Sequence, residues 1–392
     1  MPPSCLFNYK TGLAILGQPE LTLSASSKAE LMLCKAEMGK ALAGGYAFAA
    51  GVLPYEAGMW LRGVCRSSSV QRAGTHNHSV MPAVIHLYKE LPTPVRGSYP
   101  QGTESAVPTG GFILGGAFRA EQHREEYLQS LGRIKDYLAA GDCYQVNLAQ
   151  CFSTRYQGDP LTAWLALQET HPAPHSCYFD TGDNQVFGVS PERFLSISNR
   201  QVVTEPIKGS RPRGKSPGED LALGEELLSN PKDRAENLMI VDLLRNDLGA
   251  CCEPGSIQAS PLFELRRFSN VQHLVSTVSG TLRRDLSPLD ALLSAFPGGS
   301  ITGAPKKRAM EIIAELEPVP RGAYCGSFFW MDNKGNLDSN ILIRTLQTDG
   351  DQLYCHGGGG IVFDSEPEAE YEESCFKVAK LMGALEERFL SL

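Results

Sequence analysis

The chain has 392 residues, enough for one large domain or two closely packed ones with a substantial core. Its hydrophobic fraction of 42% is typical of a folded globular protein and excludes a disordered one. The formal net charge of -8 argues against a nucleic-acid-binding protein, whose contact surface is normally basic. Anionic substrates are not excluded, because a site for them needs only local positive charge.

Neither a membrane segment nor a signal peptide is expected. The most apolar stretch, 41–53, is short and contains glycines, and the first residues contain neither a basic nor an apolar signal region. The 11 cysteines include no Cys-x-x-Cys pair, which is typical of reduced thiols and not of a disulfide framework or a zinc site. We therefore expect a cytoplasmic metabolic enzyme.

Two polar stretches, 66–79 and 92–111, interrupt the first third of the chain. The second is rich in Pro, Gly, Ser and Thr, a composition typical of a loop or linker. The expected organisation is a small N-terminal region at 1–95 that contributes to the sheets, a linker or loop at 96–111, and a main domain at 112–392.

The main domain is predicted to open with a helix at 121–140, where apolar residues recur at helical spacing. Alternation of apolar residues at 144, 146 and 148 predicts a strand with one buried face. Further strands are predicted at 186–189, 194–197, 201–204, 324–331, 337–346 and 352–363. The short connections between the last three predict antiparallel pairing. Because the helices are grouped and do not alternate regularly with strands, the expected class is α+β, not a Rossmann-type fold.

Two predicted helices each carry a pair of carboxylates on one face. The first begins at Asn230 and Pro231, and the second begins near Ser365, which has capping-box spacing to Glu368. The carboxylates that lie three residues apart, and so share a face, are Asp233 with Glu236 and Glu370 with Glu373, the latter followed by Lys377. Such pairs could converge on Mg²⁺, which prefers oxygen ligands. Acidic residues that merely offset the helix dipole give the same spacing more often, so spacing alone does not establish a metal site.

A basic loop follows the strand predicted at 201–204. Lys208 lies between Ile207 and Gly209, and three further cations follow it at 211, 213 and 215. A lysine in such surroundings can act as a nucleophile where burial or neighbouring cations favour the neutral amine. A solvated basic loop is the more common explanation of the same pattern.

Two glycine-rich runs, 298–303 and 357–360, would let the backbone approach an anionic ligand closely. The first is not a Walker A loop, because the Gly-Lys-Ser/Thr ending is missing. Each run alone is more often a tight turn than a binding site.

Taken together, these segments resemble the chorismate-utilising enzymes, a family that includes anthranilate, aminodeoxychorismate, isochorismate and salicylate synthases. The resemblance covers roughly 112–390, in consistent order. It rests on the motifs GDCYQVN at 141–147, SPERF at 190–194, PIKGSRPR at 206–213, DRAENL at 233–238, LRND at 244–247, GAPK at 303–306 and GGGIV at 358–362, followed by the helix with Glu370, Glu373 and Lys377. Several motifs in one order favour the functional interpretation over the simpler explanations given above.

The resemblance implies a role for each matching position. Glu192 corresponds to the general acid that protonates the departing 4-hydroxyl group, for which its pKa must be raised. Glu236 and Glu373 correspond to ligands of Mg²⁺, with Asp233 and Glu370 in support. The positions implied in substrate binding are Tyr324, Arg344, Lys377, Gly303, Gly358, Gly359, His273 and Gln145. The implied fold has two antiparallel sheets stacked face to face and flanked by helices, with 112–392 as the catalytic domain.

Lys208 distinguishes the members of the family. Anthranilate, isochorismate and salicylate synthases typically carry alanine there, whereas the members that aminate chorismate at C4 resemble this chain. In those members the lysine attacks C2 as the 4-hydroxyl group leaves, and ammonia then adds at C4 and expels the lysine. Gln145 stands where isochorismate and salicylate synthases place a water-activating lysine. Both positions favour C4 amination on the route to 4-aminobenzoate and folate.

The resemblance also implies partners and leaves alternatives. Ammonia is expected from a separate glutamine amidotransferase subunit, and 4-aminobenzoate is expected to require a separate lyase. Anthranilate synthase component I is the main alternative, and a non-enzymatic chorismate-binding homologue is disfavoured by the intact chemical residues. Ser210 replaces the usual threonine, and no Leu-Leu-Glu-Ser-like segment for tryptophan binding is found.

Overall fold

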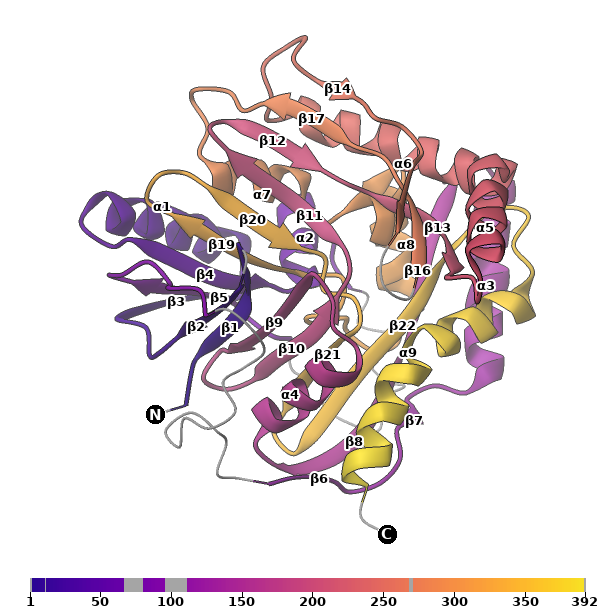
Figure 1. The fold of residues 1–392 in the computed structure, drawn as a ribbon, viewed down its shortest axis with the longest axis horizontal. Coiled ribbons are helices and arrows are strands. Elements are labelled where there is room, and N and C mark those ends of the chain that lie inside the picture. Colours follow the sequence, from indigo (N-terminus) through magenta and orange to yellow (C-terminus); the bar gives the residue numbers. More distant parts are fainter. Residues whose placement is uncertain (1, 11, 67–79, 96–110, 268–270, 391–392) are drawn as a thin grey trace.

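The computed structural model describes residues 2–10, 12–66, 80–95, 111–267 and 271–390. Within these ranges, the chain forms two large antiparallel sheets, a small third sheet, and helices that cover the sheets (Figure 1). The prediction of an α+β fold with two stacked antiparallel sheets is confirmed. The proposed linker at 96–111 and the polar stretch at 66–79 lie almost entirely outside the described residues. None of the described helices has the length and apolarity needed to cross a membrane.

The first sheet contains the longest strands and runs through the centre of the molecule. Along its main path it consists of β18 (Gly303–Ala304), β8 (Gln145–Gly158), β22 (Gln352–Ile361), β21 (Thr345–Asp349), β10 (Gln185–Ser190), β9 (His175–Asp180), β1 (Cys5–Tyr9) and β2 (Gly12–Leu16). Two short strands, β6 (Phe112–Leu114) and β7 (Arg119–Ala120), also pair with β8. The N-terminal segment therefore adds strands to the same sheet that contains the second glycine-rich run, 357–360, which we call the late glycine run.

The second sheet also combines strands from both ends of the chain. Its order is β14 (Gln258–Ala259), β17 (Val278–Thr281), β12 (Gln201–Thr204), β11 (Arg193–Ser198), β20 (Leu337–Asn340), β19 (Ser327–Asp332), β4 (Phe48–Leu53), β5 (Ala83–Tyr88) and β3 (Leu21–Ala25). The small third sheet has the order β13 (Ile207–Pro212), β16 (Val271–Val275) and β15 (Glu264–Arg267).

Apolar residues of the two large sheets meet in a shared core. Phe7 and Phe179 of the first sheet belong to the same buried cluster as Phe48 and Phe328 of the second. The rings of Phe7 and Phe48 are stacked with centroids 6.1 Å apart. This cluster fixes the two sheets face to face, because burial of large aromatic side chains is the strongest packing contribution that single residues can make.

Helices cover the remaining faces of the sheets. The helices are α1 (Lys28–Ala43), α2 (Tyr55–Arg62), α3 (Arg124–Ala139), α4 (Pro160–Thr170), α5 (Pro217–Ser229), α6 (Pro231–Gly249), α7 (Pro288–Ala295), α8 (Lys306–Leu316) and α9 (Pro367–Phe389). Helices α4 and α9 pack on the first sheet, where Trp164 and Leu381 share a buried cluster with Phe187 and Leu353 (Figure 1). Helices α6, α7 and α8 share the largest buried cluster with the second sheet.

Several predicted elements are confirmed with shifted ends, and two predictions were wrong in detail. The helix predicted at 121–140 begins at Arg124, because Glu126 accepts a hydrogen bond of 2.8 Å from the His123 backbone and closes the first turn there. The strand predicted with one buried face, β8, is buried on both faces from Gln145 to Thr154, because helices and the second core cover the two sides of the sheet. Tyr144 itself is 72% exposed.

The strand predicted at 337–346 is also wrong as a single element. It divides into β20 of the second sheet and β21 of the first, with a break between Asn340 and Thr345. Arg344 has a φ of 51°, a left-handed conformation that interrupts an extended strand. The chain crosses between the two sheets at this point, which places Arg344 at their junction.

A buried ion pair fastens α8 to α6. The Lys306 ammonium lies 2.7 Å from Asp247 Oδ2 and donates a 2.7 Å hydrogen bond to the Ala295 carbonyl. The side chains are only 9% and 7% exposed. Burial raises the pKa of Asp247 and lowers the pKa of Lys306, so each group depends on its partner to stay charged.

Asp247→Ala is therefore expected to lower the free energy of unfolding by about 3–5 kcal/mol, because it leaves a buried ammonium without a counter-charge. The matched control is Asp242→Ala on the same helix, which removes an exposed pair with Arg245 and should cost less than about 1 kcal/mol. Chemical denaturation of the two variants measures the difference. Equal losses would contradict a structural role for the buried pair.

Candidate active site

Glu192 is a buried carboxyl group at the turn between β10 and β11. It is 8% exposed, and its Oε1 accepts a 3.2 Å hydrogen bond from the Ser300 hydroxyl. Burial raises the pKa of Glu192 to about 7, and the charges of Lys208 and Lys377 together with the Ser300 hydrogen bond limit the rise. A carboxyl group with this pKa can be protonated near neutral pH, which is the property that a general acid needs.

Lys208 lies at the start of β13, half-buried, where the small third sheet packs against α6. Its neighbour Gly209 has a φ of 85°, and a Cβ there would lie 3.0 Å from the Asp233 carboxylate and 2.8 Å from Leu227. This close approach requires glycine and brings the Lys208 strand onto the helices. The charge of Lys208 lowers the pKa of both Glu192 and Glu373. These three side chains therefore lie within electrostatic range of one another.

The first turns of α9 bring two carboxylates and an ammonium against the late glycine run. A Cβ on Gly359 would lie 3.2 Å from Glu370 Oε2, 3.7 Å from Glu373 Oε1 and 3.6 Å from Lys377 Nζ. The Lys377 ammonium pairs with Glu373 at 2.6 Å and donates a 2.9 Å hydrogen bond to the Gly358 carbonyl. The absence of a side chain at 359 therefore leaves room directly in front of these charged groups.

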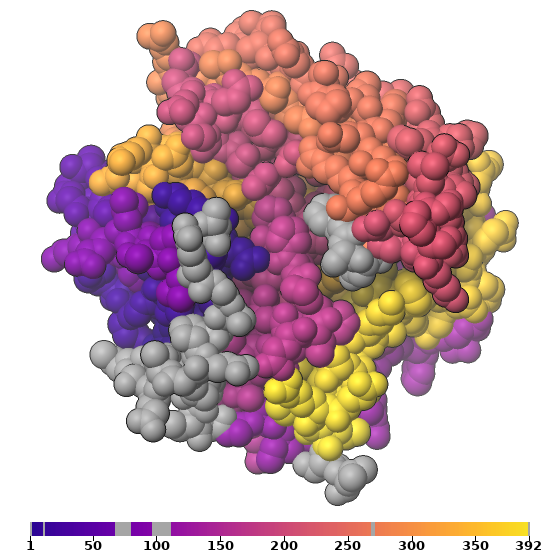
Figure 2. All heavy atoms as spheres, viewed as in Figure 1, coloured from indigo at the N-terminus to yellow at the C-terminus, as the bar shows by residue number. Residues whose placement is uncertain are grey.

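Helix α6 presents its first turns to the same region. The charge of Lys232 lowers the pKa of both Glu370 and Glu373, so α6 and α9 face each other here. Lys232 also lies 4.0 Å from Glu236. In Figure 2 the red and orange surface of the segments that include α5, α6 and the third sheet borders the yellow surface of α9. Two helices whose starts lie more than 130 residues apart in the sequence thus contribute acidic groups to one site.

Carboxylates of this site match the oxygen ligands that Mg²⁺ prefers. Burial raises the pKa of Glu370, and the charge of Glu373 raises it further, so the two carboxylates repel each other and a bound cation would relieve the repulsion. Asp233 is already paired with Arg211 at 3.0 Å. In the part of the chain that the structure describes, no three potential ligands are close enough to form a ready-made metal cluster. A cation would have to draw the carboxylates of α6 and α9 together.

Arg344 lies within electrostatic range of His273, which is part of β16 in the third sheet. Burial lowers the pKa of His273 to about 4, and the charge of Arg344 lowers it further. His273 Nδ1 forms a 2.7 Å hydrogen bond with the Ser210 hydroxyl. Among the described residues, no carboxylate forms an ion pair with Arg344, which is exposed. An exposed guanidinium without a carboxylate partner suits a carboxylate of a bound ligand.

Tyr324 is 6% exposed, and its ring stacks on His356 with a centroid distance of 5.3 Å. Burial keeps the pKa of Tyr324 well above its ordinary value, so the phenol stays protonated. It retains a proton that it can donate to a ligand. The structure places Tyr324 in the largest buried cluster, next to the fully buried Arg321.

The two glycine-rich runs converge on Gln145. Gly303 pairs with Val146 in the sheet, and a Cβ on Gly360 would lie 2.8 Å from Gln145 Nε2. Gln145 is 2% exposed, and its Nε2 has no hydrogen-bond partner among the described residues. A buried amide donor without a partner is costly unless a ligand or water completes its hydrogen bonds. This unsatisfied group supports a polar ligand at the sheet edge.

Sequence reasoning missed three groups that shape this site. Ser300 binds the Glu192 carboxyl, Lys232 acts on both carboxylates of α9, and Ser365 donates a 2.6 Å hydrogen bond to Glu370. Ser365 was predicted to cap α9 instead, but Glu366 occupies the cap position and Ser365 bonds Glu370 and the Val362 amide. Ser300 lies in the first glycine-rich run, so its position could have been found from the motif.

Comparison with known proteins agrees with the motifs. The family model for chorismate binding enzymes matches residues 49–383. Aminodeoxychorismate synthase component 1 of Klebsiella aerogenes is 49% identical over 72% of this chain and 63% of its own length. Anthranilate synthase component 1 of Pseudomonas aeruginosa is 40% identical over 82% of this chain and 64% of its own length. The chain thus spans less than two thirds of these relatives.

The solved structure of anthranilate synthase component I from Streptococcus pneumoniae TIGR4 has the same fold. It matches 97% of this chain and 90% of its own chain with a TM-score of 0.72, at 25% sequence identity. The family model covers most of the chain, including the positions of Glu192, Lys208, Glu236 and Glu373. The chain therefore belongs to the family of chorismate binding enzymes.

Proposed function

We propose that this chain is component 1 of an aminodeoxychorismate synthase, which converts chorismate and ammonia to 4-amino-4-deoxychorismate and water. The observation that carries the proposal is Lys208, an amine within electrostatic range of the buried Glu192 carboxyl, whose pKa is raised to about 7. A nucleophile and an acid in one site can displace a hydroxyl group in two steps. The name of the relative from Klebsiella aerogenes supports the same assignment.

Chorismate is a dianion, and the site offers positive charge in two places. Lys377 lies in front of Gly359, and Arg344 lies beside His273 at the junction of the sheets. These two cations would hold the two carboxylates, with Tyr324 and the Gln145 amide as hydrogen-bond donors. Such binding would orient the ring between Lys208 and Glu192.

The reaction would proceed by two successive substitutions: Lys208 displaces the 4-hydroxyl group, and ammonia then displaces Lys208. The neutral amine of Lys208 forms a bond to C2, the ring double bond shifts, and the C4–O bond breaks as Glu192 gives its proton to the leaving hydroxyl, which departs as water. Ammonia then forms a bond to C4, the double bond shifts back, and the C2–N bond to Lys208 breaks. The proton lost by the new amino group returns to the Glu192 carboxylate. The chain ends in its starting state.

Magnesium is part of the proposal. Glu236 and Glu373 would hold the ion with Glu370 in support, while Asp233 would have to leave its pair with Arg211. When bound, Mg²⁺ would neutralise the ring carboxylate of chorismate.

Addition of Mg²⁺ to the metal-free protein is expected to raise its melting temperature, because a ligand that binds only the folded state stabilises it by about 2.7 kcal/mol at 100 times its Kd. Glu373→Gln and Glu236→Gln should each remove most of this increase. The control is Glu366→Gln, which neutralises an exposed carboxylate about two helical turns before Glu373. A melting temperature of the wild-type protein that does not respond to Mg²⁺ would contradict the assignment.

The proposal extends to partners and pathway. Ammonia would come from a glutamine amidotransferase subunit, as the term component 1 in the names of the relatives suggests. A separate lyase would release 4-aminobenzoate for folate synthesis, and we propose that these steps occur in the cytoplasm.

The test is the identity of the product. The purified chain would be incubated with chorismate, Mg²⁺ and ammonium at mildly alkaline pH, and the products separated and identified by mass spectrometry. 4-Amino-4-deoxychorismate that yields 4-aminobenzoate only after a lyase is added is the expected result. Anthranilate with release of pyruvate would show the alternative, an anthranilate synthase component I, which is the name of relatives at the lower identity of 40%.

A further inference from the structure

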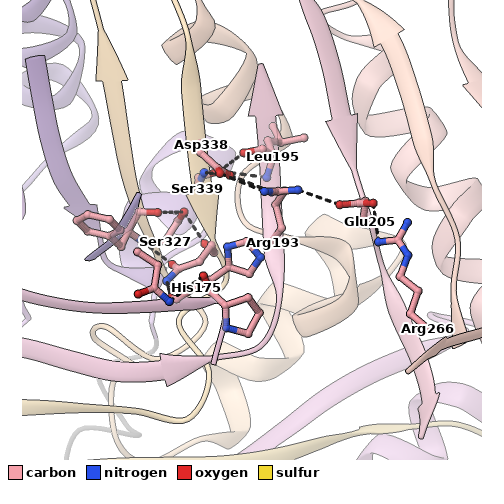
Figure 3. Close-up of polar contacts among 12 residues, drawn as sticks. His175, Arg193, Leu195, Glu205, Arg266, Ser327, Asp338 and Ser339 are labelled. Carbon is pink, nitrogen blue, oxygen red and sulfur yellow. Dashed lines mark hydrogen bonds and ion pairs between the residues drawn. The ribbon is translucent and has the colours of Figure 1, made fainter. Parts of the chain in front are cut away.

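Arg193 joins two carboxylates from different parts of the chain (Figure 3). Its Nη1 lies 2.9 Å from Glu205 Oε2, and its Nε and Nη2 lie 3.0 and 3.3 Å from the two carboxylate oxygens of Asp338. Arg266 extends the network, with Nη1 2.7 Å from Glu205 Oε1. The planar guanidinium holds both carboxylates in fixed directions, because its donors form a rigid fork.

We call the ion pair of Arg193 and Glu205 the bridge. Its two residues lie close in sequence to the two proposed reacting groups, Glu192 and Lys208. Arg193 directly follows Glu192 at the start of β11, and Glu205 precedes Lys208 by three residues. Glu192 and Lys208 belong to segments of different sheets, since β11 lies in the second sheet and β13 in the third. Glu205 directly follows β12, which pairs with β11 in the second sheet. The Arg193–Glu205 contact therefore ties the start of β11, next to the acid, to the segment that leads from β12 to the amine.

The bridge remains charged under ordinary conditions. Burial opposes ionisation of Glu205, but the hydrogen bonds and charges of Arg266 and Arg193 outweigh it and hold its pKa below the ordinary value. Burial likewise opposes the charge on Arg193, but Asp338 and Glu205 outweigh it and raise the pKa of Arg193. Arg193 and Glu205 therefore both stay charged near neutral pH, and their ion pair persists there.

We propose that Arg193 and Glu205 are positioning residues that set the separation of the Glu192 carboxyl and the Lys208 amine. This inference rests on the proposed function, because it assigns reacting roles to those two groups. An acid and a nucleophile that act on opposite ends of one displacement must be held to within a fraction of an ångström, and a misplacement of about 1 Å can cost roughly 100-fold in rate.

The experiment compares Arg193→Gln, Glu205→Gln and the double variant with Arg200→Gln. Arg200 is a matched control, because it lies in the turn between β11 and β12 and its side chain contacts Glu253, at 3.0 Å, and the Leu282 carbonyl, neither of which belongs to the site. Each bridge variant should lower kcat by about 10- to 100-fold with the KM for chorismate changed by less than about threefold. The double variant should be no worse than the poorer single variant, since both break the same link. Arg193→Lys should recover part of the loss.

The pH profile separates positioning from general damage. The groups that act on Glu192 are Lys208, Ser300 and Lys377, and the Lys208 charge lowers its pKa. If the bridge variants move Lys208 away, this effect weakens and the pKa of Glu192 rises. The alkaline limb of the pH profile of kcat/KM, where ionisation of Glu192 removes the acid, then shifts to higher pH. Unchanged kcat in the bridge variants, additive losses in the double variant, or an alkaline limb that does not move would overturn the inference.

One readout does not depend on turnover. The rate at which acetic anhydride modifies Lys208, followed by peptide mass spectrometry, reports the surroundings of the amine whether or not the chain makes the proposed product. The rate should change by at least about threefold in both bridge variants and stay constant in Arg200→Gln. An inactive or differently specific wild-type chain would contradict the proposed function, whereas equal labelling rates in all variants would contradict the bridge alone.

Discussion

Lys208→Ala is expected to lower the rate of 4-amino-4-deoxychorismate formation by at least about 1,000-fold, because it removes the group that forms the covalent bond to C2. Without the amine, displacement of the 4-hydroxyl would have to occur in one step. Binding of chorismate should weaken far less, since Arg344 and Lys377 still supply positive charge. Steady-state kinetics with ammonium as the nitrogen donor measures both quantities.

The control for this variant is Lys215→Ala. It removes the same charge from the same basic loop, but Lys215 is exposed and is not among the charges that act on Glu192. Its activity should stay within about twofold of wild type, as for most surface substitutions. Full activity in Lys208→Ala would remove the nucleophile from the mechanism, and a new product with the properties of anthranilate would assign the chain to the other branch.

Glu192→Gln is the second substitution with a large expected effect. Glutamine keeps the shape but cannot give a proton to the leaving hydroxyl, so kcat should fall by about 100- to 10,000-fold. The wild-type pKa of about 7 also predicts a pH dependence. The acid must be protonated before reaction, so ionisation of Glu192 opposes the reaction as pH rises above about 7, and this contribution to the pH profile of kcat/KM should be absent from Glu192→Gln.

Ser300→Ala provides an independent check on the identity of that titrating group. The Ser300 hydroxyl donates to Glu192 and stabilises its ionised form, which lowers the pKa of Glu192. Loss of the hydroxyl should therefore shift the alkaline limb to higher pH while most activity is kept. A shift to lower pH would mean that another group controls the limb.

The sequence predicted the class of fold and the main segments because they depend on local patterns. Alternation and short turns identified the strands at 186–189, 194–197 and 201–204, and the Asn-Pro pair at 230–231 marked the start of α6. The division of 337–346 between two sheets could not be predicted, because it depends on the path of residues 341–344 between the sheets, which includes the left-handed conformation of Arg344. A crossing between layers leaves no periodic pattern in the sequence.

The motifs also identified the residue types at the candidate site. They did not indicate the burial, the contacts or the pKa values of these residues. Burial of Glu192 results from the packing of the turn between β10 and β11 against the first glycine-rich run, which lies far away in the sequence. The Arg193–Glu205 bridge likewise depends on the pairing of β11 with its neighbours β12 and β20 in the second sheet. Spacing along the chain carries no information on such contacts, so the raised pKa and the bridge emerge only from the tertiary structure.

The most direct test of the account is the mass of the protein after reaction with chorismate in the absence of ammonia. The first substitution can then proceed, but the second lacks its nucleophile. The account predicts that wild-type protein gains the mass of chorismate less one water, that peptide mapping places the addition on Lys208, and that Lys208→Ala gains nothing. Wild-type protein that forms product at a full rate with ammonium, yet never carries an adduct on Lys208 under rapid quenching, would contradict it.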